Sequence, residues 1–386
     1  MKLGIISDCL HFRNSEGKVV TENHILLRQL EALSSYFTET LICCPFASFD
    51  QNKVVTTYTH SNIRFMELPE VGGNSIKEKG KLLTALPAWL KAFRQVDKFS
   101  DIVYQRFPNN LNLPGFFYFY FKRKKVFATY TGTWANYPSE PATYRFQRWL
   151  LTKYFRGPVW VYMDKQLSGN RIFGGISPSY SLSEWEEETV QVQQRIDRLK
   201  TSGLSILKLI TVGTLIDYKN QLGILKACVI LKRQNCPFHL TIVGDGPMRE
   251  TLAQFIKDND LCDHASIAGK KNHIELRALY RQHDFVVQAP LSEGFGKVPI
   301  EGFFHGVIPV INNIAMAKHM TGQLERGFLF DASDPGQLAE ILTSLPSKNE
   351  DLPAMIEKGR AYAKSQTLEA WAADYYSTII NYFEKP

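Results

Sequence analysis

The chain has 386 residues, of which 44% are hydrophobic and 22% charged, and its formal net charge at pH 7 is +7. This composition is typical of a globular protein with two or three domains, and it excludes collagen, coiled coils and long disordered chains. No apolar stretch reaches the roughly 18 residues that a membrane span needs. The first apolar run, which ends at Asp8, is too short for a secretory signal, so we expect the protein in the cytoplasm.

Cysteine usage and net charge indicate what kind of partner to expect. The six cysteines form no CxxC pair, which argues against a disulfide framework and a zinc ribbon, and Cys43 and Cys44 are expected to be reduced packing residues. The positive charge favours a nucleic acid, a membrane surface or a phosphorylated small molecule. Nucleic acid is the least favoured of the three, because basic residues cluster only at 122–125 and no recognition motif is present.

In the first half of the chain, short apolar runs alternate with amphipathic segments. The runs lack polar alternation, which is typical of strands buried on both faces of a parallel sheet. They cover residues 3–7, 40–44, 63–68, 102–106 and 125–131. A helix is predicted between the first two runs, because residues 25, 26, 30, 33 and 37 are apolar and share one helical face. After Thr131 the pattern predicts several short helices.

The second half repeats this alternation more regularly. Its expected strands are residues 208–213, 239–244, 265–269, 284–289, 307–312 and 327–330. One helix start is well marked, because Asp334 can cap a helix whose first residue is Pro335. Strand–helix alternation predicts right-handed βαβ units and a parallel sheet covered on both faces. The chain is therefore expected to be an α/β protein with two Rossmann-like domains that face each other.

Three segments follow from these patterns. Residues 1–175 form the first domain and 176–365 the second, and the acidic, flexible-looking stretch 183–188 lies just past their junction. Residues 366–386 are predicted to be a docking helix, because their large apolar side chains fall on one stripe. This helix closes the second domain or crosses back to the first, and the sequence alone leaves both possibilities open.

The segment from Ser292 to Gly306, SEGFGKVPIEGFFHG, is the most informative one for function. It follows a predicted strand and enters a helix that must begin within about a turn of Pro299. Glycines at the start of that helix leave backbone N–H groups open to an anion, which the helix dipole favours. Glu293 and Glu301 flank this phosphate cradle and are suitable acceptors for sugar hydroxyls. The alternative is a glycine-rich turn with two solvated glutamates.

This segment resembles the E-x7-E signature of the retaining glycosyltransferases of family 4, because seven residues separate Glu293 from Glu301 and Gly-Phe-Gly follows the first glutamate. Further similar blocks occur in the family's order. They are VGTLIDYKN (212–220), LTIVGDGPMRETL (240–252), the residues that lead to the signature, GVIPVINNIA and ERGFLFDASDP. The resemblance is dense over residues 205–345 and implies the GT-B fold, with two Rossmann-like domains across a cleft.

The resemblance also implies roles for individual residues. Glu301 would bind the ribose of a nucleotide-diphosphate sugar, Glu293 the transferred sugar, and Lys219 the leaving diphosphate. Lys219 and Glu293 are thus the expected catalytic residues. Thr214 stands where the family usually has arginine, and we expect Lys297 to supply the missing charge, unless it points to solvent. The donor-binding residues implied are Gly213, Thr214, Lys219, Gly244, Glu293, Gly294, Phe295, Gly296, Lys297 and Glu301.

The N-terminal half is expected to bind the acceptor. Thr131, Gly132 and Trp134 follow a predicted strand but include no histidine, which many relatives have in this turn. Arg106 and Arg13 also follow predicted strands and are candidates for an acceptor phosphate. Trp134 is equally consistent with a packing role, and each arginine with a solvated surface role.

Residues 113–125 join apolar and aromatic residues to four basic ones. They are expected either to contact the inner face of the plasma membrane or to form a buried helix followed by a solvated turn.

We expect a retaining glycosyltransferase that moves a hexosyl unit from a nucleotide-diphosphate sugar to a glycan or lipid-linked acceptor, in surface or exopolysaccharide synthesis. Asp258 and Asp260 have the DxD spacing of metal-dependent transferases but fall in an expected surface turn, and the histidines are not paired. Neither a metal nor another cofactor is therefore expected. The alternatives are an epimerase or hydrolase of the same fold, and a nucleotide-sugar-binding protein without catalysis.

Overall fold

The computed structural model describes residues 1–386 except 52, 71–75, 135–139, 164–170, 294, 315 and 385–386, and it leaves out the side chains of 76–83. The chain divides into two compact units. Met1–Ser179 and Leu368–Pro386 form the first, and Tyr180–Thr367 forms the second.

The N-terminal unit is a twisted sheet between two layers of helices. Its strands are β1 (Lys2–Ile6), β2 (His11–Arg13), β3 (Val19–Thr21), β4 (Glu39–Ala47), β5 (Thr56–Thr57), β6 (Ile63–Pro69), β7 (Ile102–Phe107), β8 (Lys125–Tyr130), β9 (Val159–Val161) and β10 (Ile172–Gly174). Its helices are α1 (His24–Ser34), α2 (Ile76–Phe99), α3 (Asn112–Phe121), α4 (Ala142–Lys153) and α14 (Leu368–Glu384). The strand order is β10-β9-β8-β7-β1-β4-β2-β3-β5, and β6 also pairs with β4.

Alternate residues of the central strands enter two separate cores. In β1, Ile6 packs toward α2, α3 and α4, whereas Leu3 and Ile5 pack toward α1 and α14. Cys43 and Cys44 are free and buried, one in each core, as predicted for reduced packing residues. This arrangement explains why the strands show no polar alternation.

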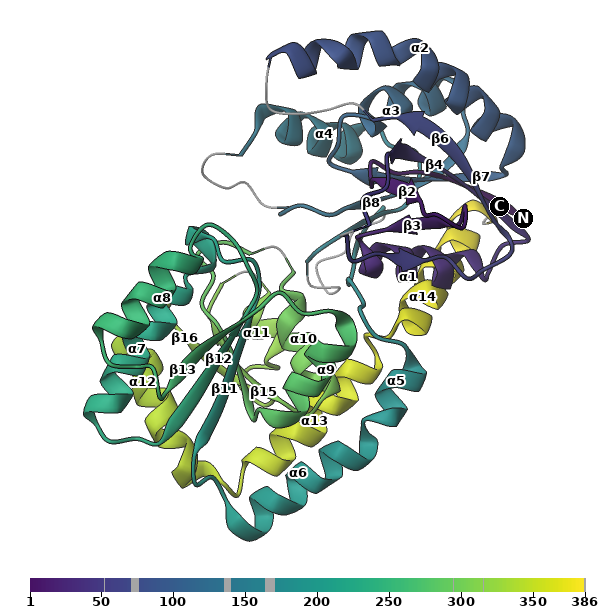
Figure 1. Cartoon of the computed structure of the whole chain (residues 1–386). Helices are drawn as coiled ribbons and strands as arrows, with labels where there is room; N and C mark the ends of the chain where they lie inside the picture. The colour runs from purple at the N-terminus through teal and green to yellow at the C-terminus, as the bar shows by residue number, and fades with distance from the viewer. Residues whose placement is uncertain are drawn as a thin grey trace. The chain divides into compact units, whose positions relative to one another are not determined.

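The C-terminal helix α14 docks on the N-terminal unit (Figure 1). Its residues Trp371, Tyr375 and Ile379 are buried in the core that α1 also covers. Tyr375 stacks on Trp160 of β9 with ring centroids 3.8 Å apart, and its hydroxyl lies 3.1 Å from Thr129 Oγ1 of β8. The structure thereby decides the question that the sequence left open: the helix crosses back.

The C-terminal unit contains a six-stranded parallel sheet of order β13-β12-β11-β14-β15-β16. Its strands are β11 (Leu207–Val212), β12 (Phe238–Val243), β13 (Ala265–Gly269), β14 (Phe285–Gln288), β15 (Ile308–Asn312) and β16 (Phe328–Phe330). Its helices are α5 (Leu182–Glu187), α6 (Thr189–Ser202), α7 (Gln221–Arg233), α8 (Arg249–Asp258), α9 (His273–Gln282), α10 (Lys297–Phe304), α11 (Ala317–Met320), α12 (Pro335–Ser344) and α13 (Leu352–Lys364), with 3-10 turns at Asp217–Lys219 and Leu345–Lys348. Helices α7, α8 and α12 share one core, and α9 lies on the other face.

Most of the predicted elements are confirmed. Every predicted strand is present to within a few residues, and Asp334 caps α12 with Pro335 in the first turn. Two expectations were wrong. The stretch after Thr131 forms α4 followed by β9 and β10 in its described part rather than several short helices. The stretch 183–188 is the helix α5 and the buried Glu188, because basic side chains of α9 neutralise its charge.

Candidate donor-binding site

Two glycine turns lie against each other at the carboxyl ends of β11 and β12. Gly244 has φ 144°, and a Cβ atom at this position would lie 1.9 Å from the carbonyl oxygen of Gly213. The loops are joined by hydrogen bonds from Leu215 N to the carbonyl oxygen of Asp245 and from Met248 N to that of Leu215, at 3.0 and 2.9 Å. A larger residue at position 244 would therefore force the turns apart. Ligands of doubly wound sheets bind at such strand ends.

Lys219 is held in a short 3-10 turn between β11 and α7. Asn220 follows with φ 52°, and its side-chain oxygen accepts a hydrogen bond from Gly223 N at 3.1 Å, which starts α7. From this turn the Lys219 ammonium forms an ion pair with Glu293 Oε2. The two side chains are only partly exposed, at 20% and 29%. The structure thus brings together the two residues for which a catalytic role was predicted.

Helix α10 begins directly after the turn that contains Glu293. Gly296 precedes it with φ 72° and, having no side chain, does not itself cap the first turn. Pro299 lies within that first turn, as the sequence predicted. Phe295 is buried, and Leu291 N donates to the carbonyl oxygen of Tyr218 at 2.8 Å, which ties this loop to the Lys219 turn. Gly294 lies outside the described residues.

Glu301 is buried inside α10, and the hydroxyl of Tyr280 donates a hydrogen bond to its Oε2 at 3.2 Å. Burial and the nearby Glu301 carboxylate raise the pKa of Tyr280 well above its usual value, so this donor stays protonated. In the described part of the chain no second side chain donates a hydrogen bond to this carboxylate, and a carboxylate accepts several hydrogen bonds. Glu301 therefore occupies a fixed position from which it can accept further ones.

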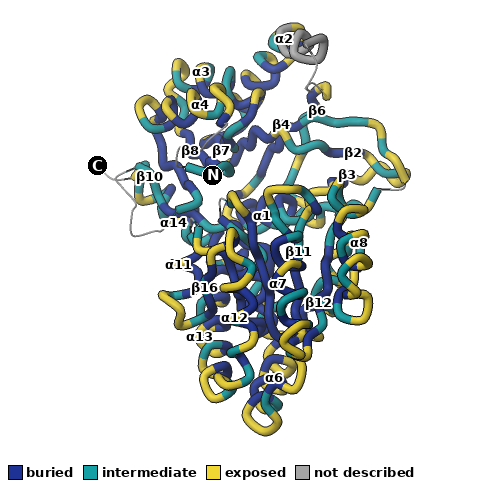
Figure 2. Tube along the Cα trace, turned by 90° about the vertical axis from the view of Figure 1, so that its left-hand side faces the viewer, coloured by how far each residue is buried: buried dark blue, intermediate teal, exposed yellow. Residues whose placement is uncertain are grey.

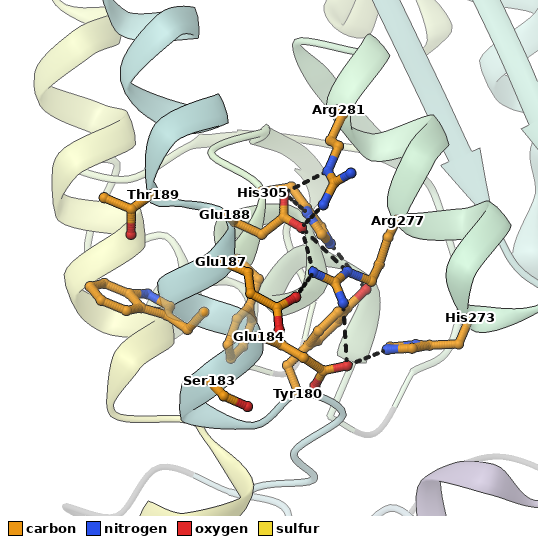
Figure 3. A network of polar contacts seen from close by, with 12 residues as sticks. Tyr180, Ser183, Glu184, Glu187, Glu188, Thr189, His273, Arg277, Arg281 and His305 are labelled. Carbon is orange, nitrogen blue, oxygen red and sulfur yellow. Dashed lines mark hydrogen bonds and ion pairs between the residues drawn. The ribbon is translucent and has the colours of Figure 1, made fainter.

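A polar network centred on the buried Glu188 reaches His305, the residue that ends the helix containing Glu301 (Figure 3). His305 follows α10, stacks on Tyr280 with centroids 5.1 Å apart, and places Nδ1 3.2 Å from Glu188 Oε2. Glu188 also pairs with Arg277 and Arg281 of α9, at 2.7 and 2.6 Å. Burial opposes the ionisation of Glu188, but His305 and the arginines outweigh it and hold the pKa of Glu188 well below its usual value.

Sequence reasoning did not identify this network. Tyr280, His305 and Glu188 are far apart in the chain and have no recognisable spacing, and Glu188 was included in a stretch thought to be flexible. Only the run of acidic residues 186–188 opposite a helix with Arg277 and Arg281 could have indicated charge pairing.

Thr214 stands in place of the family's arginine, and Lys297 is the residue expected to supply the missing charge. Thr214 is exposed, and its carbonyl oxygen accepts hydrogen bonds from Ile216 N and Gln221 Nε2, at 3.0 and 3.1 Å. Lys297 is the first residue of α10 and is partly buried. Lys297 therefore lies at the helix N-terminus that directly follows the turn containing Glu293.

The acceptor candidates all lie in the N-terminal unit, but both arginines lie inside strands instead of after them. Arg13 does not follow a strand: it is the last residue of β2, where its guanidinium pairs with Glu67 at 2.6 Å. Arg106 lies in β7 and donates to the hydroxyl of Tyr104 at 3.3 Å.

The other three candidates lie at the carboxyl end of β8. Thr131 Oγ1 donates to the carbonyl oxygen of Phe107 at 3.0 Å, and a Cβ atom at Gly132 would lie 3.1 Å from the ring of Tyr130. Trp134 packs edge-on against Tyr130 with centroids 5.2 Å apart, next to the core beneath α3. Its packing role is therefore evident.

Metal ligation and membrane crossing can be assessed for the described residues. Within them, no group of three or more histidine, cysteine or acidic side chains is arranged so that it could hold a metal ion. No helix among them combines the length and the apolar character that a membrane crossing requires.

Comparison with solved structures places this architecture among the GT-B glycosyltransferases. Anabaena HepE, solved in complex with UDP, superimposes with a TM-score of 0.70 at 15% identity, covering 99% of this chain and 100% of that one. WaaG, a glycosyltransferase involved in lipopolysaccharide biosynthesis, gives a TM-score of 0.66 at 13% identity and covers 98% and 99%. The predicted α/β class with two Rossmann-like parallel-sheet domains is therefore confirmed.

Sequence comparison gives a family match for most of the C-terminal unit. Residues 204–362 match the family model described as "Glycosyl transferases group 1". An uncharacterized glycosyltransferase of Methanocaldococcus jannaschii is 25% identical over 34% of this chain and 37% of its own length. The amylovoran biosynthesis glycosyltransferase AmsK of Erwinia amylovora is 25% identical over 42% and 41%. The chain thus spans about two fifths of the length of these relatives.

Proposed function

We propose that the protein is a retaining glycosyltransferase that moves a hexosyl unit from a nucleotide-diphosphate sugar to a glycan or lipid-linked acceptor. The observation that supports this most directly is the ion pair of Lys219 with Glu293 next to the N-terminus of α10. It combines a cation, a carboxylate and a helix dipole at the carboxyl ends of the strands. A diphosphate and a neutral sugar together require these groups.

The proposed chemistry needs no residue that attacks the sugar. Negative charge builds on the diphosphate oxygen as the bond to the anomeric carbon breaks, and Lys219 with the helix N-terminus lowers the barrier by stabilising that charge. The acceptor hydroxyl attacks from the same face, and the departing phosphate takes its proton. Glu293 orients the sugar, and Glu301 holds the ribose. Neither a metal nor another cofactor takes part.

The acceptor and the location extend the proposal. The names of AmsK and WaaG refer to amylovoran and lipopolysaccharide biosynthesis, which supports a role in surface or exopolysaccharide synthesis. Arg106, Thr131 and Gly132 are proposed to line the acceptor site, and Trp134 to support it. We propose a cytoplasmic protein that contacts the inner face of the plasma membrane.

The proposal is tested by incubating the protein with UDP-glucose and GDP-mannose, which represent the donor types named for similar proteins. Release of nucleoside diphosphate supports an enzyme, and the anomeric configuration of the product reports retention. Activity is expected to survive excess EDTA, since lysine and backbone dipoles meet the diphosphate charge. A loss of activity that manganese restores would contradict metal independence.

A second candidate is a nucleotide-sugar-binding protein without catalysis, which the threonine at position 214 favours. Saturable donor binding without turnover, over a panel of acceptors, would support it. Donor hydrolysis or epimerisation without transfer would instead indicate the related GT-B epimerases and hydrolases.

The two glutamates are expected to respond differently to substitution. Glu301→Ala should weaken binding of the nucleoside diphosphate itself by about 1–3 kcal/mol, because a charged hydrogen-bond acceptor for the ribose is lost. Glu293→Ala should mainly lower turnover, because its proposed partner is the transferred sugar. Calorimetric titration with UDP and GDP, together with turnover measurements, checks both. Unchanged nucleotide affinity in Glu301→Ala would reverse the assignment of the two roles.

A further inference from the structure

Exposed aromatic side chains gather on two neighbouring helices of the N-terminal unit. On α3, Phe121 is 77% exposed, whereas Phe116 and Phe119 are buried. The segment 113–125, predicted from sequence to be either a membrane contact or a buried helix followed by a solvated turn, is thus partly buried and partly exposed. On α4 and just after it, a further exposed set was not predicted; it consists of Phe146, Trp149 and Tyr154.

Ring contacts join the exposed side chains of α4 and the residue after it, and a cation–π contact lies close to Phe121 on α3. Phe146 stacks on Trp149 with centroids 5.7 Å apart, and Trp149 contacts Tyr154 at 5.1 Å. Two residues further along the chain, the guanidinium of Arg156 lies 4.1 Å from the ring centroid of Tyr120, which neighbours Phe121. Figure 2 shows exposed segments on α3 and on the adjacent α4. We call the exposed residues of 117–125 and 145–156 the α3–α4 surface.

The charge of this surface has one sign. Residues 112–157 contain eight lysines and arginines but a single acidic residue, Glu140, which is buried against Arg148. Lys124 is taken up by Asp97 and by backbone carbonyls of the neighbouring helix. Six basic residues remain exposed, and none of them forms an ion pair within 4 Å in the part of the chain that the structure describes. They are Lys122, Arg123, Lys125, Arg145, Lys153 and Arg156.

We propose that the α3–α4 surface docks on an anionic lipid membrane. Tryptophan, tyrosine and phenylalanine are suited to the boundary between headgroups and acyl chains. Lysine and arginine beside them add attraction to anionic lipids. An acidic protein surface would match the charges but would leave the exposed aromatic rings of α3 and α4 without a reason. The inference rests on the membrane contact included in the proposed function and names the surface that makes it, but it does not depend on the transfer reaction.

The test is co-sedimentation of the full chain with vesicles of phosphatidylcholine and phosphatidylglycerol at low salt, compared with phosphatidylcholine alone. The protein is expected to bind only the anionic vesicles. Lys122→Glu with Arg123→Glu should weaken binding at least about 30-fold, because each basic residue near the surface contributes about fivefold. Phe121→Ala with Trp149→Ala should weaken it about tenfold through lost apolar contact.

Matched controls separate this surface from general effects of charge and hydrophobicity. Lys226→Glu with Lys257→Glu makes the same charge change on exposed helices of the C-terminal unit, and Val190→Ala with Ile274→Ala removes exposed apolar groups there. Both controls should bind like the wild type.

Three outcomes would overturn the proposal. They are absence of sedimentation with anionic vesicles, equal losses in the controls, and concentration-dependent dimerisation that Trp149→Ala abolishes. The last would identify a second copy of the chain as the occupant. Unfolding curves check that each variant remains folded.

Discussion

Glu188→Gln is expected to lower the free energy of unfolding by about 3 kcal/mol, the scale of breaking a buried ion pair on one side. The glutamate is 1% exposed and pairs with Arg277 and Arg281, and its carboxylate lies 3.2 Å from His305 Nδ1. Without it, the Arg277 guanidinium would stay largely buried next to a neutral amide. Urea denaturation measures the loss of unfolding free energy. The same variant should also weaken nucleotide binding, because His305 packs on Tyr280, which donates a hydrogen bond to Glu301.

Glu187→Gln is the matched control for this prediction. Its carboxylate pairs with the same Arg277 at 2.9 Å, but it is 59% exposed. Water screens such pairs, so the expected loss is below about 1 kcal/mol. Equal losses in the two variants would mean that burial of Glu188 is not what gives the network its stability.

Acidification should affect the same network. Burial, opposed by Glu188, lowers the pKa of His305 from 6.5 to about 4. Between pH 4 and 6.5 the unfolded chain therefore binds a proton at His305 more readily than the folded chain does. The contribution of His305 to stability is thus present above pH 6.5 and is lost as the pH falls toward 4. Glu188, whose pKa is also lowered, acts in the same direction at still lower pH. His305→Asn should flatten the dependence between pH 6.5 and 4.

The fold was predictable from the sequence where local pattern and tertiary burial agree. Residues 3–6 of β1, for example, are apolar throughout because both faces of the sheet are covered, and this pattern is visible in the sequence. The short strands β2, β3 and β5 were not predicted, because two or three residues give no period. Glu188 was misjudged for a different reason: a buried acid looks solvated until its basic partners, about ninety residues away, are known.

The candidate site was predictable in its sequence-local part. The glycine turns and the Lys219 turn follow strands, and strand ends of a parallel sheet meet at one edge, so these groups were expected to lie close together. The support of Glu301 by Tyr280 and His305 depends on packing between α9 and α10. No spacing in the chain indicates that packing.

The ion pair of Lys219 with Glu293 predicts opposite effects of two substitutions on binding of UDP and GDP. Lys219→Ala should weaken nucleoside diphosphate binding about tenfold or more, because a charge-assisted contact with phosphate is lost. Glu293→Gln should instead strengthen it, since the Glu293 carboxylate forms an ion pair with Lys219, and a diphosphate must compete with it. Turnover of the sugar donor should still fall about 10- to 100-fold in Glu293→Gln, from the lost charged hydrogen bond to the sugar.

Lys297 completes the argument about charge. A diphosphate carries at least two negative charges, and one lysine that is already paired with a glutamate compensates them poorly. If Lys297, at the start of α10, is the second cation, Lys297→Ala should cost nearly as much donor affinity as Lys219→Ala, and Thr214→Arg should partly restore it. Titration of the four variants with UDP and GDP gives the comparison. Wild-type affinity in Lys297→Ala would assign the second charge to another part of the protein, and weaker nucleotide binding in Glu293→Gln would show that the carboxylate supports the phosphate site instead of competing for it.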